Sequence, residues 1–291
     1  MAKNLLIMGG DLRQTGVIKH LANLDITLYL AGLEELTFDH KNIKHVKLNE
    51  IDFSLMDGIL LPIPGVHDGG KIETTFSSET IILTKEMIAK TKKECVIYAG
   101  VITPYLQEIQ CAANRKMVAI FARDDVAIFN SIPTAEGALM LAIENTPVTI
   151  HQANVMILGF GRVGKTVARL FHSVGAKVSV CIRKPEDAAR VNEMGMMPLF
   201  MHSLPEAAKN QAIFINTVPY LVLNANILDH VDKAALIIDL ASKPGGTDFA
   251  YAKKLGIQTL WSLGLPAKVA PKTAGEIIGN VLAELLIKNQ P

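Results

Sequence analysis

The sequence is poor in the features that mark several large classes of protein. Its 291 residues include three cysteines, Cys95, Cys111 and Cys181, whose spacing matches no metal-binding motif. We therefore expect reduced thiols of the kind found in the cytosol, with neither a disulfide framework nor a metal site. Charges of the two signs nearly cancel, with 29 Lys and Arg against 28 Asp and Glu, and no basic tract occurs. This balance gives no indication of a nucleic-acid-binding surface.

Long hydrophobic runs are also missing. The N-terminus leads directly into a short apolar segment at residues 4–8, without the cleavable apolar stretch of a signal peptide. No apolar run reaches the length that a bilayer requires, so we expect a cytoplasmic protein without a membrane segment. What the sequence does have is 49% hydrophobic residues and enough length for two domains with packed cores.

Short apolar segments alternate with helical patterns along the whole chain. In the first part we expect strands at residues 5–8, 26–30, 46–48, 58–61, 96–98 and 118–121, and helices at 12–23, 86–91 and 104–115. In the second part we expect strands at residues 155–158, 177–182, 197–200, 212–215, 235–239 and 257–260, and helices at 163–174, 186–194 and 204–210. This alternation predicts an α/β fold with doubly wound parallel sheets of the Rossmann type.

The predicted domains are an N-terminal α/β domain at residues 1–130 and a dinucleotide-binding domain at 131–271, with a cleft between them. A helix near 271–288 has one apolar face, and we expect the segment 272–291 to pack back on the N-terminal domain. A further helix is expected to begin near Ser131 or Thr134, either of which can cap it, because Pro133 suits a first helical turn.

The strongest motif follows the strand at 155–158. It is a Gly-x-Gly-x-x-Gly turn that opens a helix, and its residues are Gly159, Phe160, Gly161, Arg162, Val163 and Gly164. The first glycine makes the tight turn, the second allows a pyrophosphate to approach the backbone, and the third lets the helix pack on the strand. The strand before it and the helix after it favour a dinucleotide site over a packing turn. Arg162 is a candidate for a pyrophosphate contact, with a side chain pointing into solvent as an equal alternative.

The end of the next strand indicates which dinucleotide binds. NAD enzymes place an acidic residue there to bind the ribose 2′-hydroxyl, whereas this sequence has Arg183 and Lys184. Two cations can pair with a 2′-phosphate, so we predict NADP as the cofactor. The alternative is that both are solvated surface charges, which contribute little.

Later loops and one early turn supply the remaining candidates. Loops after parallel strands border the ligand crevice of such folds, and those expected to contact the cofactor contain Thr217, Val218, Pro219, Leu240 and Ala241. Lys272 and Thr273 open the last helix, where Lys272 is positioned to bind a carboxylate or transfer a proton. In the first domain, Arg13 is a candidate carboxylate clamp and Gln14 stands beside it, just after a glycine turn. We thus predict Lys272, Arg13 and Thr273 as catalytic residues, and these three with Gln14, Ser131 and Thr134 as substrate-binding residues.

Several blocks of sequence resemble the A-subunit family of dipicolinate synthases over nearly the whole chain. They are Gly9-Gly10-Asp11 with Arg13-Gln14, Arg123-Asp124-Asp125, residues 130–137, residues 239–242 with 244–248, and residues 264–266 with 270–275. The resemblance implies an NADP-dependent oxidoreductase of sporulation, located in the mother-cell cytoplasm. It implies that dihydrodipicolinate, formed by dehydration of 4-hydroxy-tetrahydrodipicolinate, is oxidised to dipicolinate. It also implies the flavoprotein-like B-subunit of dipicolinate synthase as partner, and we expect a homo-oligomer.

The two-domain plan is also similar to that of the D-2-hydroxyacid dehydrogenases. Those enzymes carry His-x-Ala-x-x-Thr after the last strands, and here the same frame begins with Lys268 and ends with Thr273. The missing histidine disfavours hydroxyl-to-ketone chemistry. Two other functions stay open, namely an NADP-dependent dehydrogenase of another small carboxylic acid and a non-catalytic, dinucleotide-binding regulatory protein. No residue is marked as the base for dehydration, since His67 lies in a flexible loop.

Overall fold

The computed structural model describes residues 3–288, apart from the side chains of Asp68 and Lys288. The end of the predicted segment 272–291, residues 289–291, lies outside this range. The chain folds into two compact units. Unit 1 comprises the described residues up to Ala127 together with those from Ala270 onward, and unit 2 comprises Ile128–Val269.

Unit 1 is built on a six-stranded parallel sheet with the order β3-β2-β1-β4-β7-β8. Its strands are β1 (Lys3–Met8), β2 (Ile26–Ala31), β3 (Ile43–His45), β4 (Gly58–Leu60), β7 (Val96–Ala99) and β8 (Lys116–Ala119). A small antiparallel pair is formed by β5 (Lys71–Ile72) and β6 (Ile81–Ile82). Its helices are α1 (Arg13–Ala22), α2 (Lys85–Ala89), α3 (Pro104–Ala113) and α11 (Pro271–Lys288). Helix α4 (Asp124–Asn145) begins in unit 1 and continues into unit 2.

Unit 2 has a second six-stranded parallel sheet, with the order β11-β10-β9-β12-β13-β14. Its strands are β9 (Asn154–Leu158), β10 (Lys177–Ile182), β11 (Met197–Phe200), β12 (Ile213–Asn216), β13 (Leu236–Asp239) and β14 (Gln258–Trp261). Its helices, after α4, are α5 (Arg162–Ser173), α6 (Pro185–Glu193), α7 (Leu204–Ala208), α8 (Ala225–Leu228), α9 (Phe249–Leu255) and α10 (Leu265–Val269). Counted within each unit, both sheets have the Rossmann strand order 3-2-1-4-5-6, which confirms the predicted fold class.

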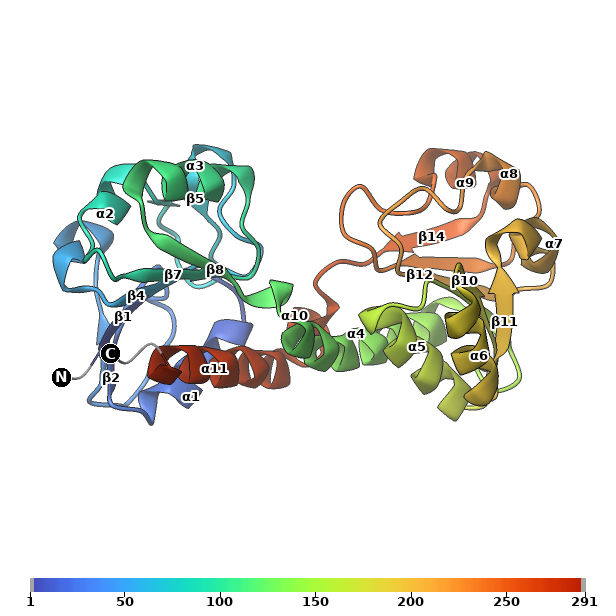
Figure 1. Ribbon diagram of the computed structural model, residues 1–291, viewed down its shortest axis with the longest axis horizontal. Coiled ribbons are helices and arrows are strands. Elements are labelled where there is room, and N and C mark those ends of the chain that lie inside the picture. Colours follow the sequence, from blue (N-terminus) through green and yellow to red (C-terminus); the bar gives the residue numbers. More distant parts are fainter. Residues whose placement is uncertain (1–2, 289–291) are drawn as a thin grey trace. The chain divides into compact units, whose positions relative to one another are not determined.

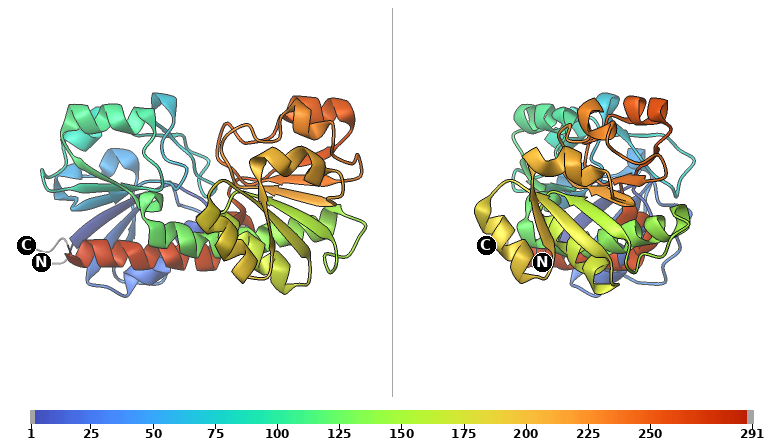
Figure 2. Two further views of the ribbon diagram at one scale, coloured as in Figure 1. Left: turned by 45° about the vertical axis from the view of Figure 1, so that its right-hand side comes forward. Right: turned by 90° about the vertical axis from the view of Figure 1, so that its right-hand side faces the viewer.

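Both sheets are covered on their two faces, as the views in Figures 1 and 2 show for each unit. Successive residues of a strand point to opposite faces, so a strand buried on both sides is continuously apolar. In β1, Leu5 and Ile7 pack toward the face covered by α1 and α11, while Leu6 and Met8 pack toward the face covered by α2 and α3. Strand β9 divides its side chains in the same way between the α4, α5 and α6 face and the α7, α8 and α9 face.

Helix α11 completes the core of unit 1, although it is the last element of the chain. Its apolar face, which includes Ile278, Leu282 and Leu286, joins the same cluster as α1 and β1. Two glycines of α11 allow a close approach, because a Cβ at Gly275 would overlap the carbonyl oxygen of Arg13 and one at Gly279 would lie 2.9 Å from His20 Cβ. Figure 1 shows α11 and α1 side by side.

Helix α4 differs from its prediction. It begins at Asp124, not near Ser131 or Thr134, and Pro133 lies inside it. The Asp125 carboxylate accepts the Val126 N–H, which places acidic groups where a helix N-terminus favours them. Proline removes one backbone donor, and the turns that follow Pro133 are held by Ala135, Ala138 and Ala142 in the core of unit 2.

Helix α4 bears on the prediction that no apolar run is long enough to cross a bilayer, because it is long although polar residues such as Asn130, Ser131 and Glu136 interrupt its apolar ones. This one helix of the described chain is long and apolar enough to cross a membrane by length and composition, with a mean hydropathy of 1.5 over its most apolar window. Of that window, 39% is buried inside the structure, including Ala135, Ala138 and Ala142 in the core of unit 2. Length and composition alone are weak evidence for a membrane segment, because a packed core helix passes the same test.

Smaller differences occur in weakly apolar segments. The strand expected at 46–48 is instead β3 at Ile43–His45, and residues Leu48–Glu50 form a 3-10 turn. This edge strand buries little surface, so its hydrophobic pattern is faint. The pair β5 and β6 and the short helices α8, α9 and α10 were not predicted from the sequence. Each has at most seven residues, which is too short for a repeating hydrophobic pattern to be recognised.

Candidate functional site

The glycine turn after β9 has the geometry of a dinucleotide-binding loop. Gly159 has φ +95°, a conformation that L side chains rarely adopt, and a Cβ there would lie 2.8 Å from Thr217 Oγ1. A Cβ at Gly164 would overlap the carbonyl oxygen of Gly159, so this glycine allows α5 to pack against the strand. The first and third glycines therefore have the structural roles that the motif requires.

Gly161 is different from the other two, because a Cβ at this position would meet no protein atom within 4 Å. Its backbone φ of −81° also lies in a region open to any residue. Neither packing nor conformation explains a glycine here, whereas a pyrophosphate resting on the backbone does. Within the described chain, no hydrogen bond uses the Gly161 N–H, which lies at the N-terminal end of α5. The turn thus fits a dinucleotide.

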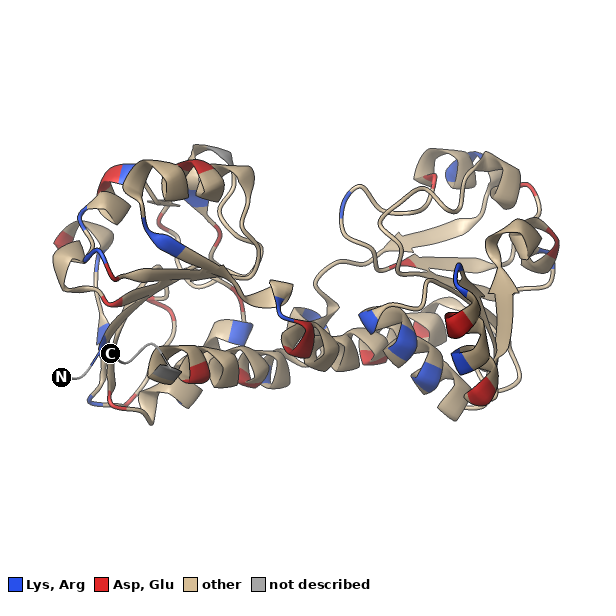
Figure 3. Ribbon diagram, viewed as in Figure 1, with Lys and Arg blue, Asp and Glu red and all other residues tan. Residues whose placement is uncertain are grey.

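The predicted cofactor residues lie around this turn. Arg162 is exposed in the first turn of α5, and Phe160 is buried with Lys165 Nζ 5.2 Å from its ring centre. Arg183 and Lys184 follow the carboxyl end of β10 and are both exposed. Lys184 Nζ lies 3.8 Å from a Glu186 carboxylate oxygen, whereas Arg183 has no acidic partner within 4 Å in the described part of the chain. Figure 3 shows basic and acidic residues interspersed on the helices of both units.

Two buried polar residues hold the loops that follow β12 and β13. Asp239, fully buried, accepts four hydrogen bonds at 2.7–2.9 Å, from the Asn216 amide, the Thr247 hydroxyl and the backbone N–H groups of Ala241 and Gly246. Asn216, also fully buried, accepts from the Val218 N–H and donates to the Val218 carbonyl. A buried carboxylate with every partner in place fixes the loops around it.

This network positions the predicted residues Thr217, Val218, Pro219, Leu240 and Ala241. The Thr217 hydroxyl donates to the Leu158 carbonyl, directly behind the glycine turn. Sequence reasoning did not single out Asn216 and Asp239 as the anchors. The signal available was a polar residue at the last position of each of two buried strands, Ile213–Asn216 and Leu236–Asp239.

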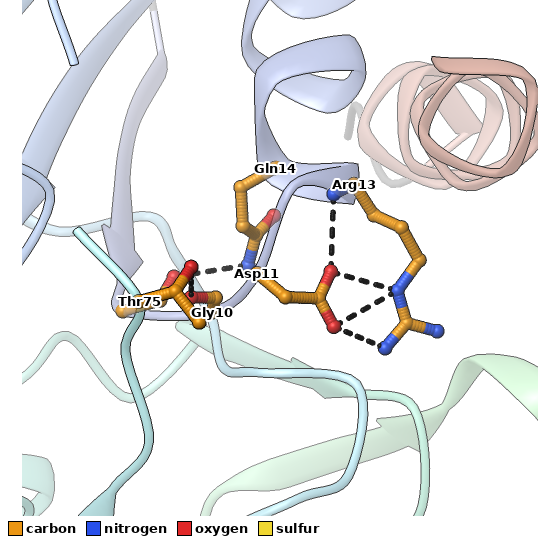
Figure 4. A network of polar contacts seen from close by, with 6 residues as sticks. Gly10, Asp11, Arg13, Gln14 and Thr75 are labelled. Atoms are coloured by element: carbon orange, nitrogen blue, oxygen red, sulfur yellow. Dashed lines mark hydrogen bonds and ion pairs between the residues drawn. The ribbon is translucent and has the colours of Figure 1, made fainter. Parts of the chain in front are cut away.

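The predicted carboxylate clamp Arg13 already has a carboxylate inside the fold (Figure 4). Its guanidinium makes a bidentate contact with Asp11, with nitrogen–oxygen distances of 2.6 and 2.9 Å, and its side chain is 7% exposed. Burial raises the pKa of the Asp11 carboxyl, but the hydrogen bonds and charge of Arg13 outweigh it and leave the pKa lowered. Gln14 is buried as well and donates to the Gly9 carbonyl. Both side chains therefore serve the fold, and their substrate contacts stay predictions.

Ser131 and Thr134 also make internal bonds. Because both lie in the middle of α4, neither is the predicted cap. The buried Ser131 hydroxyl donates to the Ile128 carbonyl and also shares a hydrogen bond of 2.6 Å with the Thr166 hydroxyl of α5. Thr134 donates to the Asn130 carbonyl, one turn back along the helix. The Ser131–Thr166 contact joins α4 to the helix that the glycine turn opens.

Lys272 and Thr273 are exposed in the first turn of α11, as their positions in the sequence predict. Lys272 borders a cavity of about 580 Å³ between α1 and α11, whose other lining residues include Thr15, Lys19 and His20. A second cavity of about 440 Å³ lies at the carboxyl ends of β1 and β4, beside Gly10 and Asp11. Its lining includes three acidic residues, Asp11, Glu73 and Glu79, against one lysine, Lys71, which disfavours a dianion there.

Metal chemistry has no evident site in the described residues, where no group of three or more His, Cys, Asp or Glu side chains is arranged to hold an ion. Burial raises the pKa of the Cys95 and Cys181 thiols to about 11, so neither is a reactive thiolate near neutral pH.

Comparison with known proteins extends these observations. Residues 4–121 match the model of the N-terminal domain of the dipicolinate synthase A-subunit. Residues 136–242 match that of the NAD binding domain of D-isomer specific 2-hydroxyacid dehydrogenases. The structure of apo D-lactate dehydrogenase from Escherichia coli superposes with a TM-score of 0.59 at 10% identity, covering 99% of this chain and 98% of that one, which shows a shared fold.

Two relatives cover the chain over nearly its whole length. The dipicolinate synthase A-subunit of Bacillus subtilis (strain 168) is 43% identical over 286 residues, which are 98% of this chain and 96% of that protein. The crystal structure of the dipicolinate synthase A-subunit from Bacillus halodurans is 46% identical with a TM-score of 0.97, and covers 100% of this chain and 99% of that one. Because these relatives are 43% and 46% identical over 98% and 100% of the chain, the chain belongs to the A-subunit family of dipicolinate synthases.

Proposed function

We propose that this protein catalyses the NADP-dependent oxidation of dihydrodipicolinate to dipicolinate. The observation that carries the proposal is the open space at Gly161, in a chain that belongs to the dipicolinate synthase A-subunit family. The substrate arises from 4-hydroxy-tetrahydrodipicolinate by loss of water. Its oxidation removes one hydride and one proton from the ring, and the product is an aromatic pyridine dicarboxylate.

Bound NADP supplies the hydride acceptor. The residues of this chain hold and orient the reactants around it. The N-terminal end of α5 at Gly161 receives the pyrophosphate, and Arg183 with Lys184 pairs with the 2′-phosphate. Asp239 anchors the loop that follows β13, in which Leu240 and Ala241 are our candidates for contacts with the cofactor. Lys272 and Thr273, both exposed, are our candidates for a substrate carboxylate or for the ring proton.

The overall reaction is tested with the purified protein, 4-hydroxy-tetrahydrodipicolinate and NADP. NADPH and pyridine dicarboxylate, both followed by their absorbance, should form together and in equal molar amounts. Turnover of linear 2-oxo acids without turnover of the cyclic substrate would instead indicate a dehydrogenase of another carboxylic acid. Bound cofactor with no turnover, even after addition of the B-subunit, would indicate a regulatory protein.

The preference for NADP is tested separately at Arg183. We expect Arg183→Asp to lower the ratio of NADP affinity to NAD affinity by about tenfold or more, because one charge-assisted hydrogen bond is worth roughly 1.5–3 kcal/mol. Lys177→Asp is the matched control, since Lys177 is exposed at the opposite end of the same strand. An unchanged ratio in Arg183→Asp would show that the 2′-phosphate is not bound here.

By the same family membership we propose a role in sporulation, in the mother-cell cytoplasm. The name of the relatives indicates a second polypeptide in the synthase, and we propose a flavoprotein-like B-subunit as the partner of this chain. We further propose that the chain forms a homo-oligomer. Sedimentation of the chain alone and with the B-subunit tests both assemblies.

A further inference from the structure

A tight turn after β13 carries an exposed lysine, and the backbone around this turn contacts a partly exposed tryptophan. Residues Ser242 to Gly245 form the turn, closed by a hydrogen bond of 2.8 Å from the Gly245 N–H to the Ser242 carbonyl. Lys243 occupies its second position and is exposed. Within the described residues no acidic oxygen lies within 4 Å of its ammonium group.

Both ends of this turn are attached to Trp261. The indole N–H of Trp261 donates to the Ala241 carbonyl at 3.0 Å. At the other end, a Cβ on Gly245 would lie 3.4 Å from the indole ring, so the backbone rests against it. Phe249 stacks on the indole with ring centres 5.2 Å apart, and Trp261 nevertheless remains 40% exposed. The turn and the indole therefore hold each other in place through these contacts.

The buried carboxylate of Asp239 also fixes this turn, from the side of the protein interior. It binds the N–H groups of Ala241 and Gly246, which flank the turn on its two sides. The backbone that presents Lys243 is thus anchored before and after the lysine. A lysine on an anchored backbone loses less conformational freedom on binding an anion than a lysine on a mobile loop does.

The strand order places this turn relative to the dinucleotide. Arg183 follows β10, on one side of β9, and the proposed 2′-phosphate contact assigns the adenosine half of the cofactor to that side. The cofactor crosses the sheet edge at the switch point between β9 and β12. Its nicotinamide half is therefore directed toward the loops that follow β12 and β13. The turn that carries Lys243 belongs to the second of these loops.

We propose that Lys243 and Trp261 form a binding site for a planar ring that carries a carboxylate, on the nicotinamide side of unit 2. The lysine pairs with the carboxylate, and the exposed part of the indole contacts the ring. This assignment rests on the proposed function, and it identifies a group of unit 2 that contacts the pyridine or dihydropyridine dicarboxylate. A solvated turn lysine beside a purely structural tryptophan is the alternative.

The chain reports on this site directly, because Trp261 is its single tryptophan. Pyridine-2,6-dicarboxylate is titrated into the full-length protein saturated with NADP, and the fluorescence of Trp261 is followed. We expect quenching in the unchanged protein. In Lys243→Ala the titration midpoint should rise about tenfold or more, the value of one charge-assisted hydrogen bond. Lys243→Arg should restore most of the affinity.

Lys233→Ala is the matched control, since Lys233 is exposed just before the amino end of β13, the strand that the turn with Lys243 follows. Its midpoint should not move, and the affinity for NADPH, measured by NADPH fluorescence, should be equal in all variants. Equal midpoints for Lys243→Ala and the unchanged protein would overturn the role of Lys243, and unquenched Trp261 with bound dicarboxylate would overturn that of the indole. If the unchanged protein shows quenching and Lys243→Ala shows the raised midpoint, but the cyclic substrate is not turned over, the binding site stands and the proposed reaction fails.

Discussion

The two units have the same strand order, yet their first strand-to-helix turns serve opposite purposes. In unit 1 the turn after β1 is filled by its own side chains, since a Cβ on Gly10 would lie 2.6 Å from Gln14 Nε2, and Arg13 binds Asp11. The backbone of that turn is also in use, because Gly10 donates to the Glu73 carbonyl and accepts from the Thr75 N–H. In unit 2 the space at Gly161 stays open. A Rossmann topology thus creates a crevice, and local residues decide whether a ligand or the chain itself fills it.

Closing the open turn should change binding most strongly. Gly161→Val should weaken binding of NADP by about 100-fold or more, roughly 2.7 kcal/mol, because the side chain takes the place of the pyrophosphate. The melting temperature of the cofactor-free protein should hardly change, since a Cβ there meets no protein atom within 4 Å. Calorimetric titration and thermal unfolding measure the two quantities. If the valine variant binds NADP tightly, the open turn of unit 2 is not the pyrophosphate site, and the proposed difference between the two turns is wrong.

Next in size are the glycines that are packed in both units. Gly164→Ala in unit 2 and Gly275→Ala in unit 1 each place a Cβ onto a backbone carbonyl oxygen, of Gly159 and Arg13 respectively. We expect each to lower the free energy of unfolding by about 1–3 kcal/mol, the usual cost of overpacking. Gly161→Ala is the control with no such contact. Urea unfolding curves give the comparison, and equal stability of all three variants would contradict it.

Removing the Arg13–Asp11 ion pair from the turn of unit 1 should have a smaller effect on stability. Asp11→Asn should destabilise the protein by about 1–2 kcal/mol at neutral pH, because Arg13 keeps only a neutral partner in a largely buried position. The folded-state pKa of Asp11 is lowered, so its contribution is full above the unfolded pKa of about 3.9 and is lost as the pH falls through the folded value. The difference between variant and unchanged protein should therefore shrink in acid. A difference independent of pH would exclude the ion pair as its cause.

The weakest contrast between the units concerns the thiols. Cys111 is exposed on α3, whereas Cys95 in unit 1 and Cys181 in unit 2 are buried with pKa values raised to about 11. In native protein near pH 8 we expect one thiol to react rapidly with a disulfide reagent and the other two to react only after unfolding. Rapid reaction of two thiols would show that one sheet opens more readily than the other.

The sequence predicted the sheets and the geometry of the glycine turn after β9 well, because those depend on local patterns. Strands such as Leu5–Met8 and Val155–Leu158 are apolar on both faces, and Gly159, Gly161 and Gly164 stand in a fixed spacing. It predicted the start of α4 poorly, since Pro133 looked like a first-turn residue and the fold tolerates it inside the helix. It also could not show that Arg13 is paired with Asp11 or that Asp239 collects four donors, because both depend on atoms brought together by folding.

The packing of α11 against α1 bears on how the chain acquires its structure during translation. Unit 1 begins with strands that leave the ribosome before unit 2, but its core includes Ile278, Leu282 and Leu286, which are made after the whole of unit 2. Domains generally fold as units in the order of synthesis. Here the inserted unit 2 can complete its sheet while unit 1 still exposes the apolar surface that α11 will cover. We therefore expect the nascent N-terminal unit to expose this apolar surface until residue 286 has emerged.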